Sequence, residues 1–293
     1  MEKNKYIGVV ILNYNSYNLT IKLVNKLSLM SYVDYICVVD NNSNDNFDNL
    51  FESKKIHYIK NNRNLGYAAG NNIGLRFLIE EKGCDVVFIS NPDVIFEEET
   101  VIEITRILRN SSDIVLASAK RYGPSSEIIH QYHIFPSLKE SIINNFYLAR
   151  KFFLKKKDYN KQYKEVEEAD TYLYVDAVPG AFLGIRSSFL VEISYMYEGT
   201  FLYCEEIILG RQAKELGYKA AIINTCSYIH NHKMSHFSNR KMFWQDRQSL
   251  LIYYKKFHLL NNIETFMLKV SILLGTIEYN VAYFILKKVM HLK

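Results

Sequence analysis

The stretch DVVFISNPD, residues 85 to 93, decides the fold class. Its first six residues are rich in β-branched and aromatic side chains, which predicts a strand buried on both faces. The polar residues Asn91, Pro92 and Asp93 then end that strand. Taken alone, this triplet is an ordinary turn, because Pro and Asp are common turn formers. A further role for Asp93 depends on which other strand ends lie beside it.

The chain before this stretch repeats a pattern of strand, loop and helix. Strands are expected at 7–12, 35–40 and 56–60, and helices at 19–30, 46–53 and 67–82. This alternation predicts an α/β fold with a mostly parallel, twisted sheet flanked by helices. Polar clusters at 13–15, 40–45 and 91–93 follow three of the strands. Since ligands bind beyond the carboxyl ends of such strands, these clusters are the expected binding site.

The rest of the chain is less regular and ends in helices. Residues 175–186 predict a strand, a tight turn and a second strand, and a helix is expected from about Glu205 to Gly217. A strand follows at 220–224, and the tail from 243 to 293 has a helical pattern. We therefore expect an α/β domain over 1–236, in two halves (1–121 and 122–236), and a helical segment over 237–293.

The charge balance is mild overall but locally basic. The chain of 293 residues has 36 basic and 31 acidic side chains, a net charge of +5, which argues against a nucleic-acid binder. Residues 139–164 hold eight Lys or Arg against two acids, and residues 255–293 hold six Lys against two Glu. Such segments suit anionic lipid or acidic substrates, or are simply a solvated surface. The four cysteines form no CxxC pair, which disfavours zinc and favours a reduced, cytosolic compartment.

The tail carries an apolar stripe. Its members are Phe266, Val270, Leu273, Ile277, Val281 and Phe284. The uncharged run 270–277 is much shorter than the ~20 residues that a membrane-spanning helix needs. Two alternatives remain: an amphipathic helix lying on a membrane surface, or a helix packed on the protein's own core.

Two carboxylates at strand ends are candidates for nucleotide binding. Asp40 ends the strand at 35–40, where a carboxylate accepts hydrogen bonds from a base or from ribose hydroxyls. The alternative for this loop is helix capping by residues such as Asn42. Asp93 lies 53 residues further on, at another strand end. It is a candidate to bind a divalent cation, Mn²⁺ or Mg²⁺, that bridges diphosphate oxygens.

Three further side chains are candidates for the chemistry. Glu205 and Glu206 begin a predicted helix, where carboxylates are favoured by the helix dipole alone. Adjacent helical residues point about 100° apart, so at most one of the two is the general base and the other is structural. His230 follows the strand at 220–224, which makes it a candidate metal ligand or phosphate contact, with a structural role as the alternative.

Taken together, these residues resemble glycosyltransferase family 2, the inverting enzymes with the GT-A fold. The likeness runs from about residue 7 to residue 254 and is strongest to rhamnosyltransferase-like and galactofuranosyltransferase-like bacterial members. It is carried by VVILNYN, VVDNNSND, NNRNLGYAAGNNIG, FISNPDV, PGAFLGIRSSF, TFLYCEEIILGRQAKELG and YIHNH, in that order. Each motif is weak by itself, whereas their order and spacing are specific.

The resemblance implies a role for each matching residue. Asn13, Asp40 and Asn42 would contact the nucleotide, and Asn64 and Gly66 match the family's donor loop. Asn91 and Asp93 stand at the outer positions of the family's DxD-type metal motif, and His230 matches a histidine that completes the metal shell. Glu206 matches the catalytic base. Three positions depart from the family pattern: Asn91 replaces an acid, Glu206 stands where Asp is commoner, and Gln212 replaces an arginine.

The resemblance implies transfer of a sugar from a UDP- or dTDP-sugar to an acceptor hydroxyl, with 1–121 as the donor half and 122–236 as the acceptor half of a GT-A catalytic domain. The basic segment and the apolar tail favour a lipid-linked saccharide as that acceptor. The expected place is the inner face of a bacterial membrane, in capsule, O-antigen or exopolysaccharide synthesis. A sugar-nucleotide nucleotidyltransferase is the rival enzyme, but its glycine-rich phosphate loop has no counterpart in NYNSYN, residues 13–18. A catalytically degenerate partner subunit is the non-enzyme rival. Asn91 favours it, while Asp93 and Glu206 argue against it.

Overall fold

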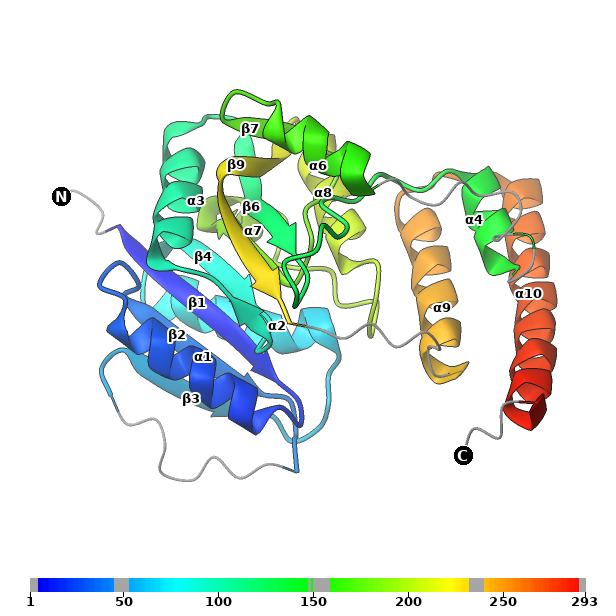
Figure 1. Cartoon of the computed structure of the whole chain (residues 1–293), viewed down its shortest axis with the longest axis horizontal. Coiled ribbons are helices and arrows are strands. Elements are labelled where there is room, and N and C mark those ends of the chain that lie inside the picture. Colours follow the sequence, from blue (N-terminus) through cyan, green and yellow to red (C-terminus); the bar gives the residue numbers. More distant parts are fainter. Residues whose placement is uncertain (1–4, 45–52, 147–148, 150–158, 232–239, 290–293) are drawn as a thin grey trace. The chain divides into compact units, whose positions relative to one another are not determined.

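The computed structural model describes residues 5–44, 53–146, 149, 159–231 and 240–289. The chain forms two compact units (Figure 1). One consists of Met1–Ile134, Tyr159–Phe201 and Glu205–Met234, and the other of Phe135–Asp158, Leu202–Cys204 and Ser235–Lys293. In this grouping, residues 135–158 and 202–204 belong with the C-terminal helices, whereas the division after residue 236 stays a prediction. The predicted helix at 46–53 lies largely outside the described residues.

The first unit is built on a nine-stranded sheet. Its order is β3-β2-β1-β4-β8-β6-β9-β5, with β7 paired to β9. The strands are β1 (Tyr6–Asn13), β2 (Tyr35–Asp40), β3 (Ile56–Lys60), β4 (Cys84–Ser90), β5 (Val94–Ile95), β6 (Ile114–Tyr122), β7 (Tyr172–Val175), β8 (Phe182–Arg186) and β9 (Lys219–His230). The strands predicted in the first 90 residues are all present.

The sheet is parallel in its N-terminal part and mixed beyond it. β1, β2, β3 and β4 pair in parallel, as the alternation of strands and helices predicts. β8 runs antiparallel to both β4 and β6, and β5 and β7 run antiparallel to β9. Of the two strands predicted in 175–186, the second is β8, whereas the first is displaced to Tyr172–Val175 as β7. The two do not pair with each other, because β8 lies between β4 and β6 and β7 pairs with β9.

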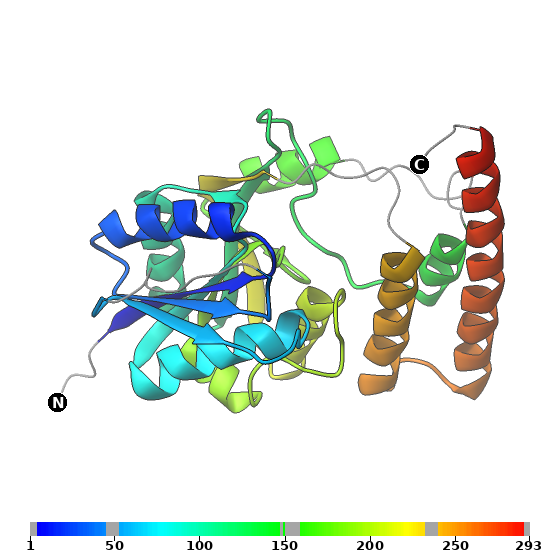
Figure 2. The same ribbon diagram turned by 90° about the horizontal axis from the view of Figure 1, so that it is seen from below.

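Helices cover both faces of this sheet, as Figure 2 shows for α1 and α2. The helices of the first unit are α1 (Tyr17–Leu29), α2 (Tyr67–Arg76), the π-helical turn η1 (Phe77–Glu81), α3 (Glu98–Asn110), α6 (Tyr159–Glu167), α7 (Ser187–Glu192) and α8 (Glu205–Glu215). Side chains alternate across β1, so Val9 and Ile11 join the core formed with α1 and α3. Val10 joins the other core, with α2 and α8. This burial on both faces accounts for the continuous apolar run of the strand.

The second unit is helical. It contains α4 (Leu138–Asn145), α9 (Arg240–Lys256) and α10 (Asn262–Val289). α4 begins with a capping box between Ser137 and Glu140. Asn145 Nδ2 donates to Ser271 Oγ over 2.7 Å, which joins α4 to α10. These contacts explain why α4 groups with the tail, and the predicted helical tail is present as two helices.

Candidate functional site

The carboxyl ends of β1 and β2, called this edge of the sheet below, hold a buried pair of polar side chains. Register places Asn13 beside Asp40, and both side chains are fully buried. Asn13 Nδ2 donates to Asp40 Oδ1 over 3.3 Å and to Ser43 Oγ over 2.9 Å. Its Oδ1 accepts from the hydroxyl of Thr20 over 2.7 Å. Asn13 therefore ties α1, β1 and the loop after β2 together.

Both carboxylate oxygens of Asp40 accept hydrogen bonds from other residues of the protein. Oδ1 also accepts from the backbone N–H of Ser43 over 3.1 Å, and Oδ2 accepts from the hydroxyl of Tyr58 over 3.3 Å. A carboxylate has about four lone-pair sites, so acceptor positions remain on Asp40, although the residue is 0% exposed. Asn42 differs from Asp40, because it is exposed and has a left-handed φ of 64°. Its backbone conformation is that of a turn residue.

Asn41 is the side chain at this edge that sequence reasoning missed. It is 2% exposed and its Nδ2 donates to Asn64 Oδ1 over 2.9 Å and to the carbonyl of Gly66 over 3.1 Å. Its Oδ1 accepts from Asn61 Nδ2 over 3.1 Å and from the backbone N–H of Leu65 over 3.0 Å. Asn41 thus holds the predicted donor loop in place. Nothing local distinguishes it from the other asparagines of NNSND.

Gly66 stands at a close approach of two backbones. Its φ is +85° and its ψ −172°, a conformation open essentially only to glycine. The next N–H, of Tyr67, donates to the carbonyl of Phe201 over 2.9 Å. A Cβ at position 66 would lie 2.3 Å from that carbonyl oxygen. The glycine therefore lets the segment that ends at Phe201 dock on the start of α2.

The NPD turn leaves the sheet at the same edge as Asn13 and Asp40. Ser90 lies beside Ile11 in the β1–β4 register, so the turn starts close to the end of β1. The backbone N–H of Asn91 donates to the carbonyl of Ala181 over 2.8 Å. This bond joins the NPD turn to the turn before β8.

His230 and Asp93 are in contact. β9 continues past residue 224 to His230, which corrects the expectation that the histidine follows the strand. Val94 pairs with His230 in the short β5–β9 ladder, which brings the preceding residue, Asp93, close to His230. His230 Nε2 lies 3.2 Å from Asp93 Oδ1. On its other side, Nδ1 accepts a hydrogen bond from the guanidinium of Arg121, a residue absent from the sequence-based candidates.

The carboxylate of Asp93 suits a hard divalent cation, whereas the imidazole of His230 is a softer ligand that suits Mn²⁺ better than Mg²⁺. Neighbouring ligands of an octahedral Mg²⁺ lie roughly 3 Å apart, given metal–ligand distances near 2.1 Å, and the Asp93–His230 separation is 3.2 Å. Within the described residues no group of three or more His, Cys, Asp or Glu side chains gathers around one point. Substrate phosphates and water usually complete such a shell. Asp93 and His230 therefore fit as the protein's part of a site finished by a diphosphate. The structure places the backbone of Asn91 in the adjoining turn.

Glu206 lies beside the turn before β8. Its Oε1 accepts from the backbone N–H of Gly180 over 3.3 Å. Glu206 is half-buried and lines a small cavity with Tyr67 and Gly180, whereas Glu205 is only 4% exposed. Burial, followed by the charges of Glu206 and Glu205, raises the pKa of Tyr67 well above its usual value. Its hydroxyl therefore stays protonated and donates to the carbonyl of Gly180 over 2.5 Å.

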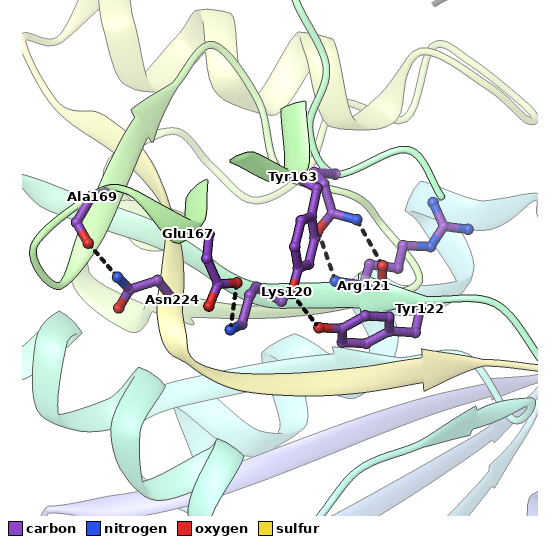
Figure 3. A network of polar contacts seen from close by, with 8 residues as sticks. Lys120, Arg121, Tyr122, Tyr163, Glu167, Ala169 and Asn224 are labelled. Carbon is purple, nitrogen blue, oxygen red and sulfur yellow. Dashed lines mark hydrogen bonds and ion pairs between the residues drawn. The ribbon is translucent and has the colours of Figure 1, made fainter. Parts of the chain in front are cut away.

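Figure 3 shows how α6 is held against β6, the strand that carries Arg121. Lys120 Nζ lies 3.0 Å from Glu167 Oε2, and the hydroxyls of Tyr122 and Tyr163 are 3.0 Å apart. These contacts flank Arg121 on both sides in the sequence. They fix the strand from which the guanidinium reaches His230.

Solved structures of glycosyltransferases share this fold. The chain aligns with GalNAc-T7 solved with UDP, GalNAc and Mn²⁺ at a TM-score of 0.62 and 12% identity, covering 87% of this chain and 48% of that one. It aligns with a mannosyltransferase of Pyrobaculum calidifontis, solved with GDP-Man and Mn²⁺, at a TM-score of 0.56 and 10% identity, covering 96% and 76%. The fold is therefore that of the GT-A glycosyltransferases.

The sequence itself defines the family. The model of glycosyl transferase family 2 matches residues 8–190, and the chain belongs to this family of enzymes. A hexosyltransferase of low-salt glycan biosynthesis, Agl10 of Haloferax volcanii, is 26% identical over 77% of this chain and 67% of its own length. The rhamnosyltransferase WbbL of Escherichia coli is 24% identical over 61% of this chain and 64% of its own length. The family resemblance seen in the motifs is thereby confirmed.

Proposed function

We propose that this protein is an inverting glycosyltransferase that moves a sugar from a UDP- or dTDP-sugar to a hydroxyl of a saccharide acceptor. One observation supports this most directly. The turn at Gly180–Ala181 accepts a hydrogen bond from Asn91 and donates one to Glu206. It therefore joins the candidate diphosphate end of the site to a carboxylate suited to deprotonating an acceptor.

The nucleoside would lie at the β1–β2 edge. Asp40 offers acceptor positions to a base N–H or to ribose hydroxyls, and Asn13 fixes its orientation. Asn64 and Gly66 shape the adjoining loop through their bonds to Asn41. This loop is already ordered before the donor arrives, so donor binding loses less conformational entropy.

Glu206 would act as the general base. It takes the proton of the acceptor hydroxyl as that oxygen attacks the anomeric carbon on the face opposite the diphosphate. Glu205 is the neighbouring residue and is buried, and its charge would stabilise the N-terminus of α8. Asp93 and His230, with Asn91 beside them, would hold a Mn²⁺ or Mg²⁺ ion. When bound, this ion supplies positive charge that stabilises the departing diphosphate.

A pair of matched variants tests this assignment. Turnover of a panel of UDP- and dTDP-sugars is measured with and without Mn²⁺, and donor binding is followed by thermal shift. Glu206→Gln is expected to keep donor binding and lose turnover by at least about 100-fold, on the order seen for general-base removal. Glu205→Gln is the control with the same chemical change one residue away. A larger loss for Glu205→Gln would reverse the two roles.

Asp93→Ala tests the cation site in the same assay. It is expected to abolish transfer and to remove the Mn²⁺-dependent part of nucleotide binding. Metal-dependent binding that survives in this variant would take Asp93 out of the metal site.

We also propose that α10 places the enzyme on an anionic membrane surface, where a lipid-linked acceptor is available. No helix in the described part of the chain is long and apolar enough to cross a membrane. The exposed apolar side chains of α10 are Ile263, Phe266, Met267, Val270, Leu273, Leu274, Ile277, Val281 and Phe284. They include the whole predicted stripe, so that stripe is exposed and the opposite face packs on α4.

Basic residues of the second unit favour an anionic lipid. Lys269 is exposed on α10, which also carries Glu264 and Glu278, and Lys255 and Lys256 end α9. Lysines beside an apolar helix face attract anionic head groups while the apolar side chains enter the interface. Together with the similarity to a bacterial rhamnosyltransferase, this supports our proposal of a peripheral enzyme at the inner face of a bacterial membrane, acting in capsule, O-antigen or exopolysaccharide synthesis.

Vesicle flotation tests the membrane proposal. The protein is expected to float with phosphatidylglycerol vesicles and less with phosphatidylcholine vesicles, and Leu274→Glu should release it. Leu216→Glu is the matched control, since the two leucines are 49% and 45% exposed and Leu216 lies after α8. If both variants float to the same extent as the wild type, the membrane proposal is refuted. A fall in oligomer mass on Leu274→Glu, with no lipid effect, would assign the face to a second copy.

A further inference from the structure

The contact between Arg121 and His230 fixes where the imidazole carries its proton. A guanidinium has five N–H donors and no acceptor, so Nδ1 of His230 must accept. The single ring proton of the neutral imidazole is then on Nε2. From there it points to Asp93 Oδ1, 3.2 Å away. The result is a directed chain of hydrogen bonds from Arg121 through His230 to Asp93.

This chain conflicts with metal ligation. A metal binds the lone pair of a ring nitrogen, and the other nitrogen then carries the proton. Ligation through Nε2, the atom that faces Asp93, therefore needs a proton on Nδ1, where the guanidinium of Arg121 also donates. Two donors cannot share this contact. We propose that Arg121 and a divalent cation are mutually exclusive partners of His230, so that loading the cation site displaces the Arg121 guanidinium. The proposal rests on the cation site of the proposed function.

The surroundings of Arg121 confine this displacement to its side chain. Gln131, which is fully buried, accepts from the backbone N–H of Arg121 over 2.9 Å and donates to its carbonyl over 2.7 Å. The backbone is thus held on both sides. Nε of Arg121 is buried, and among the described residues it has no hydrogen-bond partner. The guanidinium therefore has a donor that is unused while it contacts His230.

A released guanidinium suits one class of ligand. Its parallel N–H groups match the paired oxygens of a phosphate or diphosphate, and such charge-assisted bonds are strong. A diphosphate that takes Arg121 frees His230 for the cation, and a cation on His230 frees Arg121 for the diphosphate. The two ligands therefore favour each other beyond their direct contact, and the coupling acts in both directions.

Mn²⁺ affinity measured by electron paramagnetic resonance tests this exclusion without any turnover. Arg121→Met removes the donor and keeps much of the length of the side chain. It is expected to bind Mn²⁺ at least about fivefold more tightly than the wild type in the absence of nucleotide, a typical size for coupled sites. The gain in Mn²⁺ affinity on adding UDP or dTDP should shrink in the same variant.

Lys120→Met is the matched control. It removes one positive charge from the neighbouring position of β6, where Lys120 contacts Glu167 instead of His230. If both variants tighten Mn²⁺ binding equally, net charge explains the effect and the exclusion is refuted. If Arg121→Met binds Mn²⁺ no more tightly than the wild type, the exclusion alone is refuted. A wild type that binds no Mn²⁺ with or without nucleotide refutes both the cation site and the exclusion.

A second measurement covers the case in which Arg121→Met does not fold. The ¹⁵N shifts of the wild-type histidine rings report their tautomers, and His230→Gln identifies the signal of His230. The proton is expected on Nε2 in the metal-free protein and on Nδ1 after Mg²⁺ and UDP are added. A metal-free His230 that already carries its proton on Nδ1 would overturn the inference.

Discussion

Gly66→Ala should destabilise the first unit strongly, because two independent costs arise at one position. The first is conformational: φ of +85° with ψ of −172° costs a residue with a Cβ about 1–3 kcal/mol. The second is steric, since the new Cβ would lie 2.3 Å from the carbonyl oxygen of Phe201. That carbonyl accepts from Tyr67 N–H over 2.9 Å, and moving it away weakens a hydrogen bond worth about 1 kcal/mol.

Together these costs lower the free energy of unfolding by about 2–4 kcal/mol. The corresponding fall in melting temperature, followed by circular dichroism, is roughly 4–16 °C for a unit of this size. Gly83→Ala is the matched control. Gly83 has a similar φ of +72°, but nothing lies within 4 Å of its added Cβ. Its substitution should therefore show the cost of a positive φ without the steric clash. If the two variants melt at the same temperature, the close approach at Phe201 contributes nothing and the reasoning is refuted.

Two further predictions concern the position of the Glu206 carboxylate and the pH dependence of stability. Gly180→Ala places a Cβ 2.6 Å from Glu206 Oε1, which should displace that carboxylate and lower kcat by about 10- to 100-fold with little change in melting temperature; an unaltered kcat would contradict the placement of the base. The hydroxyl of Ser111, followed by the ammonium of Lys219, lowers the pKa of Asp113 from 3.8 to about 2. The stabilisation from Asp113 is therefore complete above about pH 4 and is lost as the pH falls through about 2. Wild type and Asp113→Asn should differ in urea stability at pH 5 and converge near pH 2, and a difference that persists at pH 2 would argue against this pair.

The strand ends show how far local reasoning reaches. Asp40 and Asp93 are recognisable in the sequence because apolar runs end at them, and turn chemistry acts over a few residues. The contact between Asp93 and His230 depends instead on the β5–β9 register, which joins positions 137 residues apart. The sequence suggested a strand that stops at residue 224. The structure extends it to His230, because pairing with β5 and β6 continues along the chain.

Asn41 and Arg121 escaped prediction for a related reason. An asparagine in a polar loop looks the same whether it caps a turn or holds a second loop, and only the folded chain brings Asn61, Asn64 and Gly66 to Asn41. Arg121 lies near the end of a largely buried strand, as many basic residues do. Its partner His230 is 109 residues away.

By itself, the sequence determined the alternation of strands and helices, the parallel first half of the sheet and the polar strand ends. Periodicity and turn chemistry are properties of neighbouring residues, so these features are encoded locally. The tertiary structure decided the mixed strand order, the contact of Asp93 with His230 and the placing of Glu206 beside Gly180. It also decided which apolar face of α10 packs and which stays exposed. These outcomes depend on hydrogen-bond register and packing between distant segments, where the local pattern is the same for each alternative.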